Sequence, residues 1–171
     1  MKSFAALFTV VIVFCTTVIR AEEFKHQDSG LQFKLPKGWT CTEKDHKIFI
    51  TNKDKTLNCV GGVIPKESAK AIFADINKFV DSIDGFDDAE VTGGPEKETV
   101  NGLEQAWYEG TASYVGKNGE EQEFEWDMTV ITGGKKILFL VGTGALDDNE
   151  DEYEAFFESI RKIESDTNTN E

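Results

Sequence analysis

The stretch from Asn101 to Gly144 constrains the fold of this chain more than any other, because two turn signals divide it into three segments. Asn118-Gly119 is the strongest short hairpin signal, since a type I′ turn needs positive φ at both of its central residues. Gly133-Gly134 has the same backbone freedom and marks a second hairpin. The stretch therefore predicts three consecutive antiparallel strands.

The two turns also predict how the three strands pair. If each turn is a two-residue loop, Thr111 lies opposite Trp126, and Trp126 lies opposite Val141. Side chains alternate between the two faces of a strand, so one face is predicted to be apolar. This face carries Trp107, Phe124, Trp126, Met128, Val130, Ile137, Phe139 and Val141.

The opposite face of the same strands is predicted to be acidic. It carries Glu123, Glu125 and Asp127 on the middle strand. Their predicted cross-strand neighbours are mostly small and are flanked by two tyrosines: Gly110, Ala112, Gly142, Gly144, Tyr108 and Tyr114. Small neighbours leave space, so this pattern predicts a shallow acidic recess walled by the tyrosines.

Shorter strands and two amphipathic helices surround the central stretch. Strands are predicted over 31–35, 39–43, 46–51 and 57–64. Apolar residues then recur at three- and four-residue steps over 69–83, which predicts one helix of about five turns. A last helix opens within 147–152, and its predicted buried stripe is Tyr153, Phe156, Phe157, Ile160 and Ile163. The order predicts an α+β domain, an antiparallel sheet sandwiched between amphipathic helices.

The first 21 residues are predicted to be a secretory signal peptide. Lys2 supplies a minimal positive region, an apolar run follows over 4–19, and Ala21 offers a small residue for cleavage. The run is too short to span a membrane. We therefore expect an exported protein, periplasmic or extracellular, without membrane insertion after cleavage. Residues 22–164 are expected to form a single domain, and 165–171 a disordered polar tail.

The charge balance disfavours some partners. Residues 1–21 hold two of the 18 basic residues and none of the 32 acidic ones, so the remaining chain carries a net charge of −16. Nucleic acids and anionic membranes attract clustered Lys and Arg, which argues against both. An acidic chain suits simple solubility, a cationic protein partner or divalent cations.

Two cysteines, Cys41 and Cys59, remain after the predicted cleavage. An even number in an exported chain favours a disulfide between them. If 39–43, 46–51 and 57–64 form a plain meander, however, the two cysteines lie on strands about 10 Å apart, beyond disulfide reach. Both alternatives stay open. A zinc site that adds His26 and His46 has no recognised spacing.

No catalytic signature is present in the sequence. Asp147, Asn149 and Asp151 imitate a calcium loop, but Glu152 stands where the loop requires glycine, and acids also favour the first turn of a helix. The acids of the central strand have a spacing that a carboxylate-dependent hydrolase permits. Neither histidine lies near a candidate nucleophile on the predicted core scaffold, so no cofactor, metal ligand or catalytic residue is assigned.

Several short segments resemble PsbP-like domains. The run 30–39 looks like their initial strand followed by Pro-x-Gly-Trp, and the later segments 100–103, 108–110 and 156–160 look like further landmarks of the family. The family includes the photosystem II extrinsic subunit and a Ran-binding nuclear release factor. The resemblance implies a PsbP-like α/β/α sandwich and non-enzymatic binding to larger protein assemblies.

The sequence thus favours an exported accessory protein that binds a protein partner and catalyses nothing. The alternative is a module that binds a cation or small ligand in the acidic recess, and a carboxylate-dependent hydrolase is a weaker third hypothesis. The candidate binding residues are Tyr108, Tyr114, Glu123, Glu125 and Asp127.

Overall fold

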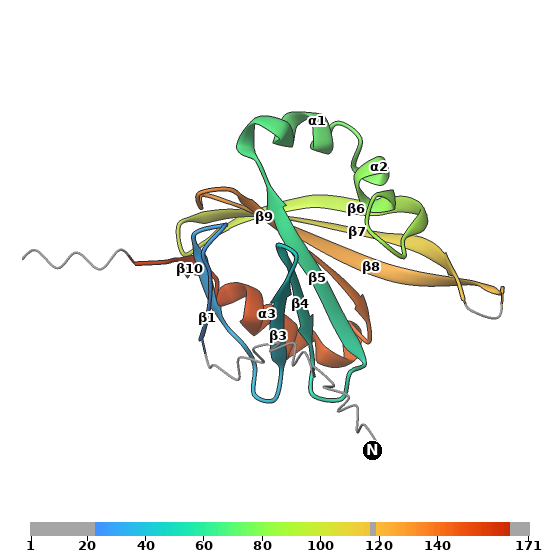
Figure 1. Ribbon diagram of the computed structural model, residues 1–171, viewed down its shortest axis with the longest axis horizontal. Helices are drawn as coiled ribbons and strands as arrows, with labels where there is room; N and C mark the ends of the chain where they lie inside the picture. Colours follow the sequence, from blue (N-terminus) through green and yellow to red (C-terminus); the bar gives the residue numbers. More distant parts are fainter. Residues whose placement is uncertain (1–22, 117–118, 165–171) are drawn as a thin grey trace, which may run out of the picture.

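The computed structural model describes residues 23–116 and 119–164, which form two antiparallel sheets (Figure 1). The smaller sheet has the order β1-β2-β10 and consists of β1 (Glu23–His26), β2 (Leu31–Lys34) and β10 (Arg161–Lys162). The larger has the order β3-β4-β5-β9-β8-β7-β6. Its strands are β3 (Thr40–Lys44), β4 (Lys47–Thr51), β5 (Leu57–Ile64), β6 (Asp87–Val100), β7 (Leu103–Val115), β8 (Glu121–Thr132) and β9 (Ile137–Gly144).

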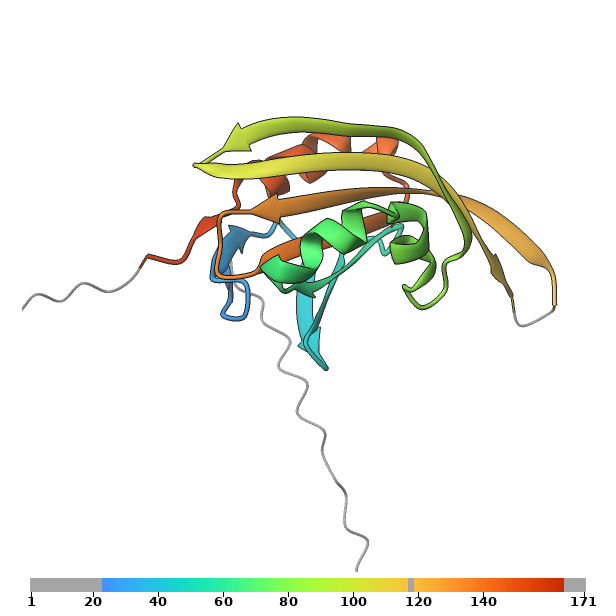
Figure 2. The same cartoon turned by 90° about the horizontal axis from the view of Figure 1, so that it is seen from above.

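Helices cover the large sheet only in part. The short helices η1 (Lys66–Ser68), α1 (Ala69–Phe73) and α2 (Ile76–Asp81) lie against one face, which we call the α1–α2 face. The other face, called the α3 face, is covered by α3 (Glu150–Glu158) together with the small sheet, and η2 (Asp147–Asn149) leads into α3. Figure 2 shows the long strands between these layers. The fold is mostly antiparallel sheet, so the predicted helical sandwich is confirmed only in part.

The predicted single helix over 69–83 was wrong. Asp75 has extended backbone dihedrals, φ −146° and ψ 75°, which end α1. Its side chain accepts a hydrogen bond from the N–H of Lys78 at 3.3 Å and so caps α2. A side-chain acceptor that satisfies a free helix N–H favours a new helix start, and apolar spacing alone does not reveal it.

The last helix is shorter than predicted. α3 ends at Glu158, and Arg161–Lys162 pair with β2 as β10. Ile160 is buried but follows the helix, and the N–H of Ile163 donates to the C=O of Gly30 at 3.0 Å. The segment after Glu158 is therefore extended and not helical. Its backbone groups pair with β2 and Gly30, and the sequence does not show these partners.

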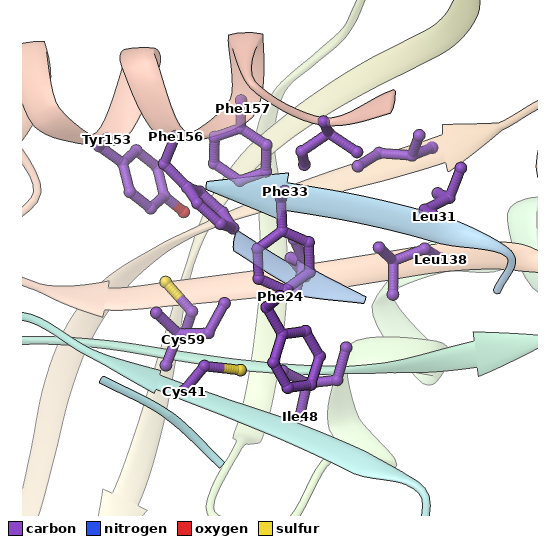
Figure 3. Close-up of a cluster of buried hydrophobic side chains, with 14 of the residues drawn as sticks. Phe24, Leu31, Phe33, Cys41, Ile48, Cys59, Leu138, Tyr153, Phe156 and Phe157 are labelled. Atoms are coloured by element: carbon purple, nitrogen blue, oxygen red, sulfur yellow. The ribbon is translucent and has the colours of Figure 1, made fainter. Parts of the chain in front are cut away.

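The two sides of the large sheet carry separate apolar clusters. On the α3 face, Phe33, Phe156 and Phe157 pack with residues of β3, β4, β5 and β9 (Figure 3). On the α1–α2 face, Trp126, Met128 and Val130 of β8 pack with the two short helices. The middle strands are thus covered on both faces.

Both hairpin registers differ from the predicted ones. β7 and β8 pair as Gly110↔Trp126 and Thr111↔Glu125, one residue from the prediction. The N–H of Gly116 donates to the C=O of Glu120, and Gly119 has φ +80°, which gives a three-residue loop with glycine in the left-handed position. Asn118, on which the prediction rested, lies outside the described residues.

The second hairpin is wider by two residues and keeps its faces. Trp126 lies opposite Thr143, and the ladder between β8 and β9 ends at Ile131↔Leu138. The N–H of Lys135 donates to the C=O of Ser29 at 2.7 Å, so a contact with the β1–β2 turn holds this loop open. A shift of two residues preserves side-chain alternation, whereas a shift of one reverses it.

The disulfide between Cys41 and Cys59 is not formed, and both side chains are buried free thiols. β4 separates the two strands, because Ile50 pairs with Cys41 on one side and with Cys59 on the other. Figure 3 shows both sulfur atoms within the apolar cluster.

Candidate functional site

The corrected register places the acidic residues of β8 on the α3 face with neighbours other than those predicted. Glu123 lies opposite Ser113, Glu125 opposite Thr111, and Asp127 opposite Glu109. On the β9 side Asp127 lies opposite Gly142, which the predicted register had placed opposite Glu125. The one-residue shift between β7 and β8 has moved every β7 neighbour.

The two predicted tyrosines do not belong to the acidic site. Tyr108 pairs with Met128 and packs in the cluster on the α1–α2 face. Tyr114 contacts Phe124 on that same face, and its hydroxyl donates to Oε1 of Gln122 at 2.6 Å. Trp107 was predicted to lie on the same apolar face as Trp126, but it pairs with Thr129 and lies on the α3 face. The proposed walls of the recess were therefore wrong.

An acidic cleft of about 550 Å³ does exist beside Glu125 and Asp127. It is bounded by β7, β8, Thr92 of β6 and the loop after β9. Its lining consists of Thr92, Glu109, Gly110, Thr111, Glu125, Trp126, Asp127, Gly144, Ala145, Leu146, Asp147 and Asp148. Five of these residues carry carboxylates and none carries a basic side chain, so the cleft concentrates negative charge. Glu123 lies on the same face but outside the lining.

Asp127 links this cleft to the interior of the protein. The hydroxyl of Tyr153 on α3 donates to its Oδ1 at 2.7 Å. Burial raises the pKa of Asp127 to about 6, the nearby Glu109 adds to the increase, and hydrogen bonds from Tyr153 and from the backbone at Gly142 oppose it. The largest effect is the cost of keeping a charged carboxylate away from water.

Gly144 of β9 lines the cleft, and Gly142 leaves room for Asp127 and Tyr153. A Cβ at Gly142 would meet the hydroxyl of Tyr153 and the carboxylate of Asp127, so a side chain there would separate the pair. Gly144 has φ +99°, and β9 leaves the sheet at this point. The N–H of Ala145 then donates to the C=O of Thr56 at 3.0 Å, and the loop that follows brings Asp147 and Asp148 to the cleft beside β8.

The thiol of Cys59 makes a hydrogen bond with the same Tyr153 hydroxyl, and Figure 3 shows both side chains in the cluster under α3. Burial raises the pKa of Cys59, of Cys41 and of the Tyr153 phenol. Each group is therefore held in its neutral form at ordinary pH. This arrangement suits structural packing and lacks the activated thiolate that nucleophilic catalysis requires.

The sequence that imitates a calcium loop lines a second cavity, of about 530 Å³, between the loops before β3 and β5 and the start of α3. Two of the side chains in its lining already have hydrogen-bond partners within the protein. Asn149 accepts from Asn52 at 3.1 Å and donates to the C=O of Ala145 at 2.7 Å, and Glu152 accepts from the indole N–H of Trp39 at 2.8 Å. Within the described residues, no three His, Cys, Asp or Glu side chains are grouped so that they could hold a metal ion.

The two histidines lie away from the cleft. His26 is fully buried on β1, where its Nδ1 is 3.0 Å from Oγ of Ser29 and its Nε2 is 3.9 Å from Glu43. His46 is exposed in the β3–β4 turn, 3.4 Å from Asp28. Neither histidine lines the cleft, so neither is placed to act as a general base beside its carboxylates.

Sequence reasoning missed four members of this site: Glu109, Asp147, Asp148 and Tyr153. A three-residue loop between β7 and β8 would have placed Glu109 opposite Asp127, and glycine at the last loop position is compatible with such a loop. No local signal brings Asp147 and Asp148 to β8. They arrive through the loop that the left-handed backbone of Gly144 redirects.

Comparison with known proteins identifies the fold. No protein-family model matches the sequence, and no curated protein matches it. A crystal structure of a Bacteroides thetaiotaomicron protein is 14% identical over 86% of this chain and 50% of that one, with a TM-score of 0.51. The solution structure of cyanobacterial PsbP from Synechocystis is 18% identical over 92% of this chain and 99% of that one, with a TM-score of 0.54.

LpqN, involved in cell envelope biogenesis of Mycobacterium tuberculosis, is 18% identical over 78% of this chain and 83% of that one, with a TM-score of 0.40. The chain has the PsbP-like fold that its landmark segments indicated, and it spans half the length of the Bacteroides protein. None of the helices in the described residues is long and apolar enough to cross a membrane.

Proposed function

We propose that this protein is an exported, non-enzymatic accessory protein that binds a basic segment of a protein partner in its acidic cleft. The observation that carries the proposal is the lining of the cleft, in which Glu109, Glu125, Asp127, Asp147 and Asp148 meet no basic side chain. Lysine and arginine side chains would satisfy these carboxylates with charge-assisted hydrogen bonds.

Electrostatics favours such a partner over a neutral one. The raised pKa of Asp127 means that burial destabilises its charged form in the free protein. A cationic group bound nearby would stabilise that charged form. The strongly negative net charge would also attract a cationic partner over a distance and increase the rate of association. The PsbP-like fold is compatible with an accessory role, although a fold alone assigns no function.

The carboxylates are spread along the cleft and are not gathered around one point. They come from β7, β8 and the loop after β9, and they include no group of three suited to hold one metal ion among the described residues. Spaced carboxylates fit the spaced cations of a protein chain better than they fit a single divalent cation. We therefore favour a peptide-like ligand over the cation-binding alternative.

The test is isothermal titration of the purified protein with an eight-residue peptide in which lysine alternates with threonine or valine. We expect the double variant Glu125→Gln/Asp127→Asn to weaken binding about tenfold at low salt, since two charge contacts of roughly 0.7 kcal/mol each are lost. Binding should also weaken as salt is added.

The matched control is Glu67→Gln/Glu98→Gln, which removes the same charge from exposed positions outside the cleft. This control should change affinity less than threefold. Equal weakening by both double variants would show a response to net charge alone, and the proposed site would then be rejected.

A further inference from the structure

The outer part of β8 has a neighbouring strand on one side only. β7 pairs with β8 along its whole length, as far as Val115↔Glu121. β9 pairs with β8 only from Trp126↔Thr143 onward and then leaves the sheet at Gly144. Among the described strands, none pairs with Glu121–Glu125 on the β9 side. Figures 1 and 2 show this end of the β7–β8 hairpin extending beyond the other elements.

The backbone groups along this edge can be assigned from the hairpin loop. The N–H of Gly116 donates to the C=O of Glu120, so the even-numbered residues of β8 direct their backbone groups toward β7. Backbone groups alternate in direction along an antiparallel strand. Glu121 and Glu123 therefore present their N–H and C=O groups outward, and both residues are exposed.

Strand β6, the edge strand of the large sheet on the far side of β7, is blocked. Side chains of α2 occupy its first half, because Asp81 accepts from the N–H of Ala89 at 2.7 Å and Asn77 accepts from the N–H of Val91 at 3.1 Å. Farther along, Pro95 lacks an N–H, and the pairing of β6 with β7 shifts at three places. Bulges, proline and covering elements are the usual means of protecting an edge. The outer part of β8 has no proline or register shift.

The side chains along this edge select the charge of an added strand. Glu121, Glu123 and Glu125 lie on the α3 face, and the last of them lines the acidic cleft. A row of carboxylates thus leads from the hairpin into the cleft. The α1–α2 face at this end of the hairpin offers Phe124 of β8 and the exposed Tyr114 of β7. A strand with cations on one face and apolar side chains on the other would match both faces.

We propose that an extended basic segment of the partner adds to β8 as a strand along Glu121–Glu125 and directs its cationic side chains toward these acids and the cleft. This inference rests on the proposed function and adds the mode of binding. A second copy of this chain is disfavoured at the edge, because its own carboxylates would lie against those of β8.

Amide hydrogen exchange measured by NMR tests the proposal directly. The probe is the alternating lysine peptide described above, added to the purified protein at saturation. We expect exchange at the amides of Glu121 and Glu123 to slow at least tenfold, because their outward N–H groups would become hydrogen-bonded. Unchanged exchange at both amides would overturn strand addition.

Two further measurements separate backbone pairing from charge. A peptide of the same sequence methylated on every backbone nitrogen keeps its charge but cannot donate backbone hydrogen bonds, and we expect it to bind at least tenfold more weakly. On the protein, Glu123→Pro removes an outward N–H that β7 does not use, whereas Glu123→Gln removes only the charge. We expect the proline variant to bind at least fivefold more weakly than the glutamine variant.

The outcomes distinguish the two proposals. If the unmodified peptide binds and Glu125→Gln/Asp127→Asn weakens it, but methylation of the peptide has no effect, the cleft is supported and strand addition is wrong. If the unmodified peptide does not bind at low salt, both proposals fail. Slowed exchange at Glu121 and Glu123 together with loss of binding by the methylated peptide supports both.

Discussion

Asp127 is the residue at which the acidic cleft and the interior of the protein meet. Its carboxylate lines the cleft, yet it accepts a hydrogen bond from the buried Tyr153 and lies where glycine at 142 leaves room. The hydrogen bonds from Tyr153 and from the backbone do not offset the loss of hydration, so the pKa of Asp127 is raised to about 6. A buried carboxylate at this position lowers the stability of the folded protein, and such a loss is common where a group is kept for binding.

This raised pKa gives a prediction for Asp127→Asn. Because the folded-state pKa of about 6 exceeds the ordinary aspartate pKa of 3.8, the folded protein binds more protons than the unfolded chain between these values. The contribution of Asp127 to the free energy of unfolding therefore falls as pH rises from about 4 to 6, by roughly 3 kcal/mol in total. Asparagine has no charge to bury and still accepts from Tyr153, so the variant should be the more stable protein at pH 7.

Urea unfolding of both proteins between pH 4 and pH 8 measures this difference. The stability advantage of Asp127→Asn should disappear near pH 4. The comparison with wild type is needed because burial lowers the pKa of His26, which destabilises the folded protein below about pH 6.5 in both. A variant that is less stable than wild type at pH 7 would contradict the argument.

At the scale of elements, α2 does more than cover apolar surface. It is only six residues long and has a single fully buried side chain, Val80. Its polar side chains Asn77 and Asp81 reach the backbone of β6 and satisfy N–H groups at the edge of the sheet. The break at Asp75 lets α2 start as a helix separate from α1, so that Asn77 and Asp81 can reach β6.

The contact between Asp81 and β6 predicts the effect of two substitutions. Asp81→Ala leaves the N–H of Ala89 without its acceptor and should lower the free energy of unfolding by about 1–2 kcal/mol. Asp81→Asn keeps an acceptor oxygen and should lose less than half of that amount. Urea titration at pH 7 compares them. Equal losses in both variants would show that charge, and not the backbone hydrogen bond, is what matters.

At the scale of the whole molecule, the part of the chain that the structure describes has two buried thiols and no disulfide between them. Cys41 and Cys59 belong to the cluster under α3 that includes Phe33, Phe156 and Phe157. Burial raises the pKa of both thiols, which lowers their reactivity. Apolar packing on both faces of the large sheet, and not a bond between these two cysteines, therefore stabilises the fold.

We expect a reducing agent to leave the melting temperature unchanged within about 1 °C. An intact disulfide would contribute about 2–5 kcal/mol, which corresponds to a shift of several degrees. Alkylation gives an independent measurement: Cys41 and Cys59 should react with iodoacetamide only after unfolding in denaturant. A fall in melting temperature on reduction would show that the two cysteines are bonded.

The site shows where sequence reasoning stops. The acids of β8 and the small residues of β9 could be identified because alternation along a strand depends only on the chain itself. The assignment of Tyr108, Tyr114 and Trp107 failed because a hairpin loop one residue longer reverses the face of every residue on β7. The wider second loop did not change the predicted faces, since a shift of two residues leaves each β9 side chain on the same face of the sheet.

The sequence by itself determined the α+β class, the three-stranded stretch from 101 to 144 and the acidic side of β8, and it left the pairing of the two cysteines open. These follow from side-chain periodicity, turn residues and spacing, which are local properties. Only the tertiary structure decided the break at Asp75, the loop held open by Ser29, the short final helix and the arrival of Asp147, Asp148 and Tyr153 at the cleft. The break at Asp75 rests on a local side-chain cap that apolar spacing does not reveal. Each of the others depends on a hydrogen bond or contact between residues far apart in the chain, and no local pattern encodes such partners.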